Sequence, residues 1–157
     1  AHHRHVQALY KELLKDVKGI TLHEAPSPEY DSNYWLCTAT LDSDLKIKGQ
    51  DKAYAEVITG AVGGAAGVTH ATKSAHTALE PNANVEAMRM FLDAAGIESR
   101  PLWKPMHCQP VYKDAPAYTN GVSESLFRVG ICLPAGPWVT DDHVRYIVDK
   151  IKAAIEL

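Results

Sequence analysis

The sequence predicts an α+β fold in which two or three helices cover one face of a small, mostly antiparallel sheet. The 157 residues, 46% of them hydrophobic and 22% charged, suffice for a core that needs neither disulfides nor metal. Segments with apolar residues at helical spacing open and close the chain, and a third lies between them. Short β-type segments separate these helices, and no internal repeat is present.

The first predicted helix begins the chain, and Gly19 is expected as its C-terminal cap. The alternating residues 20–23 predict a short strand. Residues 33–41 are rich in aromatic and threonine side chains and predict a buried strand, closed by turn residues at 42–44. The apolar face of the helix consists of Val6, Leu9, Tyr10, Leu13, Leu14 and Val17.

Residues from about 45 to 80 are predicted to be an insertion between a strand and the next helix. Within it, residues 60–67 are mostly glycine and alanine. The run from Gly67 to Ser74 is close to a phosphate-binding loop, but Thr72 stands where that motif needs its second glycine. We therefore expect a segment that joins two elements rather than a nucleotide site.

The middle of the chain has a more regular pattern. Asn84 is expected to cap a helix that Gly96 ends, and residues 97–102 are expected to form a strand. Prolines at three positions in 103–118 predict a loop. The buried face of the helix is expected to hold Val85, Met88, Phe91 and Leu92.

The last part of the chain contains a predicted short helix over 123–129 and a strand over 131–133. Proline and glycine residues in 134–137 then make a turn. Thr140 is expected to cap the final helix, whose first turn is acidic, as the positive end of a helix prefers. Its buried stripe is expected to be Val144, Ile147, Val148, Ile151 and Ile155.

Composition excludes several classes of protein. A net charge of −3 without a clustered basic face argues against a nucleic-acid partner, and no apolar run is long enough for a membrane helix. An odd number of widely spaced cysteines favours reduced thiols in a cytoplasmic protein. These cysteines are Cys37, Cys108 and Cys132.

Eight histidines invite a search for a metal site, but their spacing does not support one. His70 and His76 do not share a helical face, and the neighbours His107 and Cys108 cannot easily ligate one ion together. No paired-cysteine motif and no nucleophile-elbow motif is present. The sequence therefore predicts no metal and no hydrolase site.

Residues suited to ligand binding gather in 98–112, a segment stiffened by prolines. Arg100 and Lys104 suit phosphate or carboxylate groups, and Trp103 offers a flat apolar face for a sugar or a base. His107 adds a titratable ring.

Composition alone leaves a second interpretation of 98–112 open. The segment could be a surface loop in which Trp103 and Tyr112 fill the core. The two interpretations have equal weight at this point, because both use the same residue types.

The run ESRPLWKPMH at 98–107, followed by QPVY at 109–112, resembles the C-terminal part of the DegT/DnrJ/EryC1/StrS aminotransferases. The similarity covers nearly the whole chain except the predicted insertion. Further segments similar to that family are 10–14, 32–36, 84–97 and 130–136.

The resemblance implies that residues 1–157 are the small C-terminal domain of a fold type I aminotransferase, without the N-terminal domain that holds the cofactor. Such enzymes are cytoplasmic homodimers of polysaccharide biosynthesis that transfer an amino group, usually from glutamate, to a nucleotide-linked keto-sugar. Their pyridoxal phosphate serves as electron sink on a lysine of the missing domain. We therefore expect this chain alone to bind no cofactor and to be inactive.

The family's loop borders the cofactor cleft, so the resemblance assigns substrate binding to part of this segment. Arg100 has the alternative of a structural ion pair, while Gln109 and Tyr112 are expected to support the loop. No catalytic, cofactor-binding or metal-binding residue is expected in this chain. The candidate residues for binding the nucleotide-sugar are His107, Trp103, Lys104 and Arg100.

Two other classes of function are compatible with the sequence. The chain could be a free-standing module that binds a sugar phosphate through the same loop, or a structural or dimerisation domain. Its start at Ala1, directly inside an amphipathic pattern, favours a piece of a larger enzyme.

Overall fold

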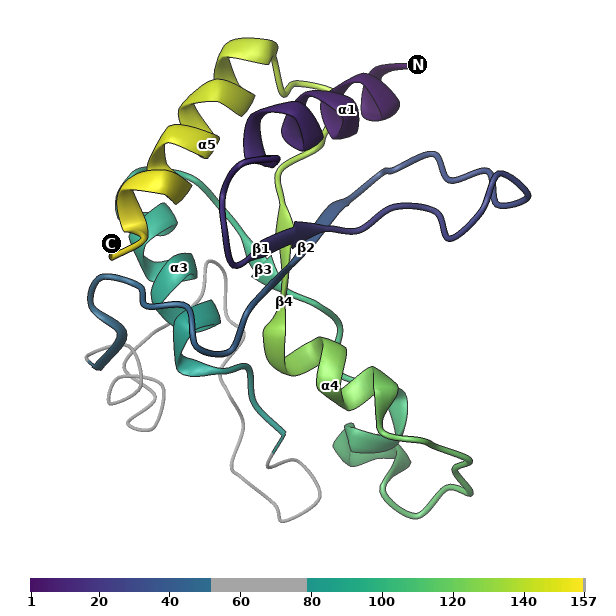
Figure 1. Cartoon of the computed structure of the whole chain (residues 1–157). Helices are drawn as coiled ribbons and strands as arrows, with labels where there is room; N and C mark the ends of the chain where they lie inside the picture. The colour runs from purple at the N-terminus through teal and green to yellow at the C-terminus, as the bar shows by residue number, and fades with distance from the viewer. Residues whose placement is uncertain (52–78, 157) are drawn as a thin grey trace.

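The computed structural model describes residues 1–51 and 79–156 and contains a four-stranded sheet of strand order β1-β2-β4-β3 (Figure 1). Every pair of neighbouring strands is antiparallel, and helices pack on the sheet, which confirms the α+β prediction. Within the described ranges, no helix is long and apolar enough to span a bilayer. The helices are α1 (His2–Leu14), α3 (Ala83–Ala94), α4 (Val122–Val129) and α5 (Asp141–Ala154), the strands are β1 (Ile20–Leu22), β2 (Cys37–Leu41), β3 (Arg100–Pro101) and β4 (Gly130–Leu133), and the 3₁₀ turns are η2 (Met106–Cys108) and η3 (Pro110–Tyr112).

The core lies between one face of the sheet and the helices α1, α3 and α5. In β2, alternate residues from Cys37 to Leu41 are buried in this core, while Thr38 and Thr40 on the opposite face are half-buried. Each large apolar side chain buried here contributes about 1.5–3 kcal/mol before chain entropy is subtracted. The helices supply Val6, Tyr10 and Leu14 from α1, Val85, Met88 and Leu92 from α3, and Val144, Ile147, Val148 and Ile151 from α5.

The strand predicted over 33–41 begins only at Cys37, so its first four residues were assigned wrongly. Side chains compete with the sheet here, because Ser32 Oγ accepts from the backbone N–H of Tyr34 and Asn33 Oδ1 accepts from that of Trp35. Tyr34 also has a φ of +51°, which a strand does not allow. These local turns bring Trp35 to the surface.

Two of the four helix-end predictions need correction. The N-terminal cap of α3 is Asn82 rather than Asn84, whose amide instead donates to the Asp42 backbone oxygen at 2.7 Å and holds α3 to the turn after β2. Gly19 has a φ of +82° but lies beyond the end of α1, which Lys15 caps, in the turn that enters β1. Gly96 does follow the C-terminal cap of α3, with a φ of +75°.

The predicted start of α5 is confirmed. Thr140 Oγ1 accepts from the His143 backbone N–H, and His143 Nδ1 accepts from the Thr140 backbone N–H, which forms a capping box. Ile155 lies just past the helix, where it pairs with Ile47 in an isolated antiparallel bridge. The predicted stripe on α5 is therefore buried as expected, except that its last member lies beyond the helix.

The strand predicted over 97–102 is reduced to the two-residue edge strand β3, which pairs with β4 through Arg100 and Pro101. Ile47 of the predicted insertion is part of the core. The rest of that insertion, with its glycine-rich stretch, the Gly67–Ser74 run, His70 and His76, lies almost entirely in 52–78, outside the described residues.

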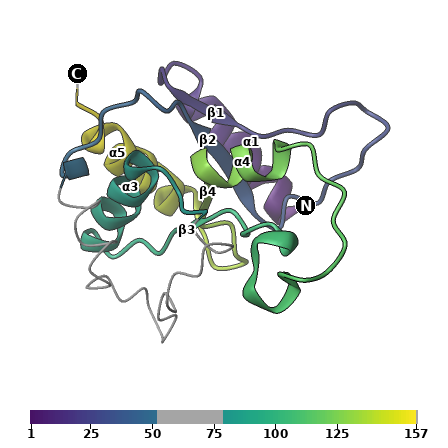
Figure 2. The same cartoon turned by 90° about the horizontal axis from the view of Figure 1, so that it is seen from below.

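Helix α4 lies on the side of the sheet away from α1 and α5 (Figures 1 and 2). Its Phe127 is buried outside the main core. The loop after β3 is joined to the C-terminal end of α4, since the Leu102 backbone N–H donates to the Gly130 oxygen at 3.3 Å. Gly130 permits this approach, because a Cβ there would meet Leu102 Cδ1 at 2.1 Å. The loop with the predicted site residues therefore rests against α4.

Candidate functional site

Arg100 begins the segment that the sequence singles out, and it lies on the edge strand β3. Its Nε donates to Glu98 Oε1 at 3.0 Å, and both side chains are more than half exposed. The structure thus contains the ion pair that was the alternative role for Arg100. An exposed pair of this kind adds little stability, so an incoming anion could compete for the guanidinium.

Trp103 lies against Trp35, with ring centroids 6.0 Å apart and an angle of 35° between the rings. The two indoles are 65% and 61% exposed, and Tyr112 is 40% exposed. The interpretation in which Trp103 and Tyr112 fill the core is therefore wrong. Trp35 was not predicted as a site residue, because residues 33–41 were expected to form a buried strand.

Lys104 approaches two groups from other parts of the chain. Its Nζ lies 3.6 Å from Glu80 Oε1 and 5.8 Å from the ring centroid of Phe127 on α4. The Gln109 amide donates to the Lys104 backbone oxygen at 3.0 Å. This bond closes the loop on itself, which is the supporting role expected for Gln109.

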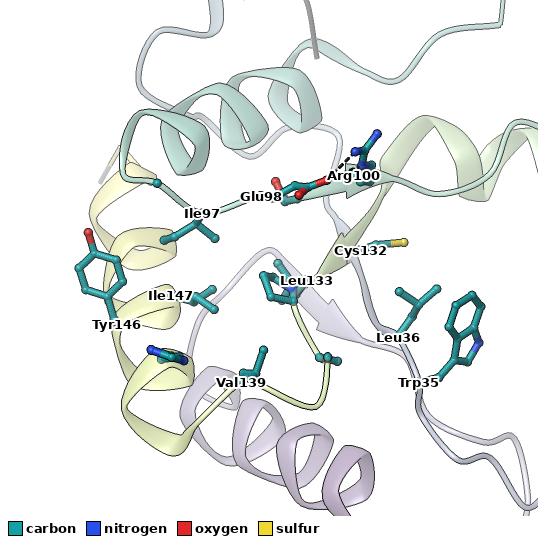
Figure 3. Close-up of a pocket in the computed structure, with 16 residues that line it drawn as sticks. Trp35, Leu36, Ile97, Glu98, Arg100, Cys132, Leu133, Val139, Tyr146 and Ile147 are labelled. Atoms are coloured by element: carbon teal, nitrogen blue, oxygen red, sulfur yellow. Dashed lines mark hydrogen bonds and ion pairs between the residues drawn. The ribbon is translucent and has the colours of Figure 1, made fainter. Parts of the chain in front are cut away.

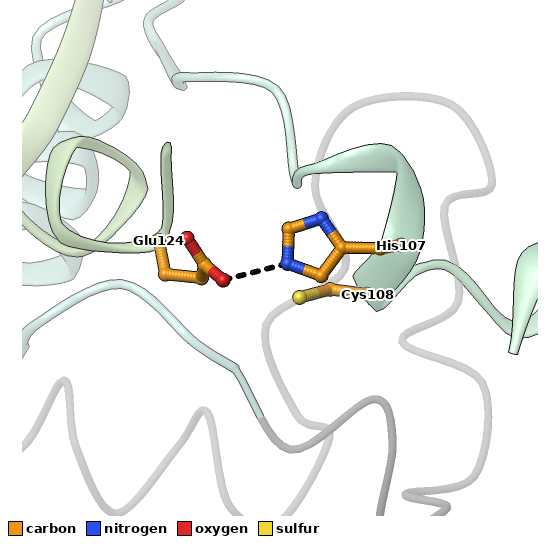
Figure 4. A group of neighbouring side chains, drawn as sticks. All are labelled: His107, Cys108 and Glu124. Carbon is orange, nitrogen blue, oxygen red and sulfur yellow. Dashed lines mark hydrogen bonds and ion pairs between the residues drawn. The ribbon is translucent and has the colours of Figure 1, made fainter. Parts of the chain in front are cut away.

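His107 is oriented by an acidic residue of α4. Its Nε2 lies 2.6 Å from Glu124 Oε1, and both side chains are about one quarter exposed (Figure 4). Hydrogen bonds from its own backbone N–H and from His107 lower the pKa of the Glu124 carboxyl. The sequence offered no sign of this partner, since an acid in the first turn of a helix usually serves the helix dipole.

Cys108 lies beside this pair, and Figure 4 shows its side chain and that of His107 both directed toward Glu124. Burial and the Glu124 carboxylate raise the pKa of the Cys108 thiol, while Lys104 and Arg128 oppose the shift. The second carboxylate oxygen of Glu124, Oε2, is buried and has no hydrogen-bond partner among the described residues.

A pocket of about 610 Å³ adjoins the loop (Figure 3). Its floor is apolar, and Trp35, Arg100 and Tyr146 stand around it. A volume of this size is typical of small-molecule sites. Because Trp35 lines the pocket and also contacts Trp103, the pocket and the loop form adjoining surfaces. The apolar lining includes Ile97, Leu133, Val139 and Ile147.

The structure does not bring the four predicted residues to a single point. Lys104 and His107 contact α4, Trp103 contacts Trp35, and Arg100 is paired at the pocket. The arrangement is therefore an elongated surface with a cationic and imidazole end on α4 and an aromatic end at the pocket.

Comparison with known proteins gives this surface a family context. The model of the DegT/DnrJ/EryC1/StrS aminotransferase family matches residues 59–152. EpsN of Bacillus subtilis (strain 168), named as a pyridoxal phosphate-dependent aminotransferase, is 38% identical over 149 residues. This chain belongs to the DegT/DnrJ/EryC1/StrS aminotransferase family. The resemblance inferred from the sequence is confirmed.

Other relatives of this DegT-family chain are similar over shorter stretches or in fold. The GDP-perosamine synthase of Vibrio cholerae is 37% identical over 68 residues, which are 43% of this chain and 18% of the relative. The aminotransferase TlmJ of Streptoalloteichus hindustanus has a TM-score of 0.63 at 14% identity. DesI, solved with its TDP-sugar product, has a TM-score of 0.63 at 18% identity.

The DegT-family chain spans only part of these relatives. Its match to EpsN covers 90% of this chain and 28% of EpsN. The matches to TlmJ and DesI cover 97% of this chain and 30% of each solved chain. The structural matches show that the fold described above is a fold found within aminotransferase chains.

The described residues of the DegT-family chain do not fit a complete pyridoxal phosphate site. This cofactor is held by a lysine amine in a pocket that also receives its ring and phosphate. Neither described pocket is lined by a lysine, and Lys104 faces Glu80 on the surface beside α4.

Proposed function

We propose that this chain is the small C-terminal domain of a pyridoxal phosphate-dependent aminotransferase that moves an amino group from glutamate to a nucleotide-linked keto-sugar. The observation that carries the proposal is the 38% identity to an aminotransferase over 90% of the chain. The names of two relatives, a GDP-perosamine synthase and an enzyme solved with a TDP-sugar, support the substrate class. The intact enzyme is proposed to be a cytoplasmic homodimer, as the family resemblance implies.

In this proposal the surface on α4 receives the substrate rather than the cofactor. Lys104 provides a cation for the diphosphate, in competition with Glu80. Trp103 and Trp35 provide exposed apolar faces on which a sugar or a base can stack. Arg100 can join them when an anion displaces its exposed partner Glu98.

His107 is proposed to contact the sugar. Because its Nε2 faces Glu124, the ring nitrogen left for a substrate hydroxyl is Nδ1. Glu124 fixes the ring in place, so the contact is preformed rather than ordered on binding. Gln109 holds the backbone of the loop and keeps Lys104 and His107 on the same side of α4.

The cofactor, when bound to the rest of the enzyme, supplies the electron sink for the transfer. The residues of this chain bind and orient the nucleotide-sugar and shield it from water. The isolated chain is therefore proposed to be inactive.

The test is the His107→Ala variant of the full-length enzyme, with each half-reaction measured separately. The half-reaction with the nucleotide-sugar should lose about ten- to a hundredfold in kcat/KM, since one placed substrate contact is worth about 1–3 kcal/mol. The half-reaction with glutamate should change little, because glutamate does not reach this surface.

A matched control is His5→Ala, since His5 also pairs with a carboxylate, Asp141, at 2.7 Å, but on α1, which Figure 1 shows on the other side of the sheet from α4. This variant should leave both half-reactions unchanged. If His107→Ala lowers both half-reactions equally, or neither, the loop is structural and the assignment of its substrate role fails.

A further inference from the structure

We propose that His107, Cys108 and Glu124 form a binding site for a borderline-soft divalent metal ion, best matched by Zn²⁺. One ligand atom from each of the three side chains lies within 4.8 Å of the other two. The three side chains converge from two elements, η2 and the first turn of α4 (Figure 4). Although His107 and Cys108 are adjacent in sequence, the turn η2 directs both side chains toward Glu124.

The donor set determines the kind of metal. A nitrogen, a sulfur and an oxygen together suit Zn²⁺ or Co²⁺, whereas Mg²⁺ and Ca²⁺ prefer oxygen alone. Tetrahedral Zn²⁺ with bonds near 2.1–2.3 Å places its donor atoms roughly 3.4 Å apart. The 2.6 Å between His107 Nε2 and Glu124 Oε1 must therefore widen by less than about 1 Å, which side-chain rotation can provide.

A carboxylate oxygen without a hydrogen-bond partner also supports a metal site. Glu124 Oε2 is buried and has no hydrogen-bond partner in the described part of the chain. A buried carboxylate oxygen without a partner costs free energy, and native proteins rarely leave one. A metal ion held between both carboxylate oxygens would give Oε2 a partner, whereas the hydrogen bond with His107 reaches only Oε1.

The charges around the site balance. Binding releases the Cys108 thiol proton to solvent and replaces the hydrogen bond between His107 and Glu124 with two bonds to the metal. One thiolate and one carboxylate then neutralise a divalent ion. Lys104, one of the two cations that act on the Cys108 thiol, has its charge offset by Glu80.

The three ligands leave a fourth position for water or an outside ligand. A metal ion bound at His107 Nε2 would leave Nδ1 for the substrate contact proposed above, so the ion and that contact can be present together. The metal proposal does not depend on that function, because metal binding can be measured on this chain without any enzymatic assay.

The experiment is a titration of the reduced 157-residue chain with Co²⁺, followed by the thiolate-to-metal charge-transfer absorption in the near ultraviolet. The band should saturate at one equivalent, and Zn²⁺ should abolish it by displacement. Cys108→Ser should remove the band, and Glu124→Gln should weaken binding by about tenfold or more.

A control is needed because the histidines at the N-terminus can also take up metal, without a thiolate. His2→Gln should leave the band and its midpoint unchanged, since His2 contacts the Gly136 backbone oxygen and no residue of the cluster. Circular dichroism of each variant confirms that it remains folded. A band that is absent at one equivalent, or that persists in Cys108→Ser, overturns the proposal.

A second measurement needs no variant. Zn²⁺ should slow alkylation of Cys108 by iodoacetamide by about tenfold or more, as read by peptide mass spectrometry, while Mg²⁺ should not. Equal alkylation of Cys108 with and without Zn²⁺ overturns the proposal even if Cys108→Ser fails to fold.

Discussion

His107 and Trp103 each depend on a residue from a different part of the chain. Glu124 lies 17 residues after His107 and fixes its ring, and Trp35 lies 68 residues before Trp103. Glu124 and Trp35 hold the side chains of His107 and Trp103 outside the core. The loop therefore presents polar and aromatic groups that do not fill the core. Substitutions in this loop should therefore separate function from stability.

Trp103→Ala tests that separation. The free energy of unfolding should fall by less than about 1 kcal/mol, since the indole is 65% exposed, whereas Met88→Ala in the core should cost about 2–5 kcal/mol. Urea unfolding of the chain measures both values. In the full-length enzyme, kcat/KM for the nucleotide-sugar should fall about ten- to a hundredfold. A loss of stability comparable to that of Met88→Ala would make Trp103 structural.

The three cysteines should differ sharply in reactivity toward a thiol reagent such as dithionitrobenzoate. Burial raises the pKa of Cys37 to about 12 and that of Cys132 to about 11, so neither is a thiolate near neutral pH. Cys108 is only half-buried. One thiol should react in the native chain and three after unfolding, and Cys108→Ser should abolish the native reaction. More than one fast native thiol would contradict the burial of Cys37 and Cys132.

At the level of elements, the junction between α4 and β4 places the site. Gly130 ends α4 and begins β4, and it accepts a hydrogen bond from Leu102 at the start of the loop. The absence of a side chain at this position lets Leu102 lie against the backbone. The geometry of this one contact therefore sets how the loop meets α4.

Gly130→Ala should disturb that contact. The added Cβ would meet Leu102 Cδ1 at 2.1 Å and the Leu126 backbone oxygen at 2.6 Å, so the free energy of unfolding should fall by about 1–3 kcal/mol. Gly136→Ala is the matched control, because nothing lies within 4 Å of its added Cβ. Its effect should stay within about 0.5 kcal/mol. Equal thermal shifts for the two variants would show that Leu102 yields without cost.

At the level of the whole molecule, the described core is continuous from α1 to α5 through the sheet. The first and last helices pack on one another, and Ile47 pairs with Ile155 near the end of the described chain. None of the buried side chains of this described core comes from the loop of residues 98–112. The chain should therefore fold by itself.

We expect the isolated chain to unfold cooperatively in urea and yet to bind no pyridoxal phosphate and to show no transamination. The physical reason is that its described pockets contain no lysine. Far-ultraviolet circular dichroism measures folding, and visible absorption after mixing with the cofactor and glutamate measures binding and turnover. A stable visible band that disappears when one particular lysine is replaced would contradict this expectation.

Local sequence patterns were sufficient for the helices. The apolar spacing of α1, α3 and α5 and the cap at Thr140 were predictable, because a helix satisfies its backbone within one segment. Strand limits were less predictable, because the backbone of a strand is satisfied by another strand. Residues 33–36 look like a strand, but the side chains of Ser32 and Asn33 accept hydrogen bonds from the backbone N–H groups of Tyr34 and Trp35 instead.

By itself, the sequence determined the α+β class, the helices with their buried faces, the family, and the segment 98–112 as the place to look for function. Only the tertiary structure decided which side chains of that segment act together. It brought His107 and Cys108 to Glu124 and set Trp103 against Trp35. Periodicity reports which face of an element is buried, but it carries no information about which distant side chain comes within hydrogen-bond distance.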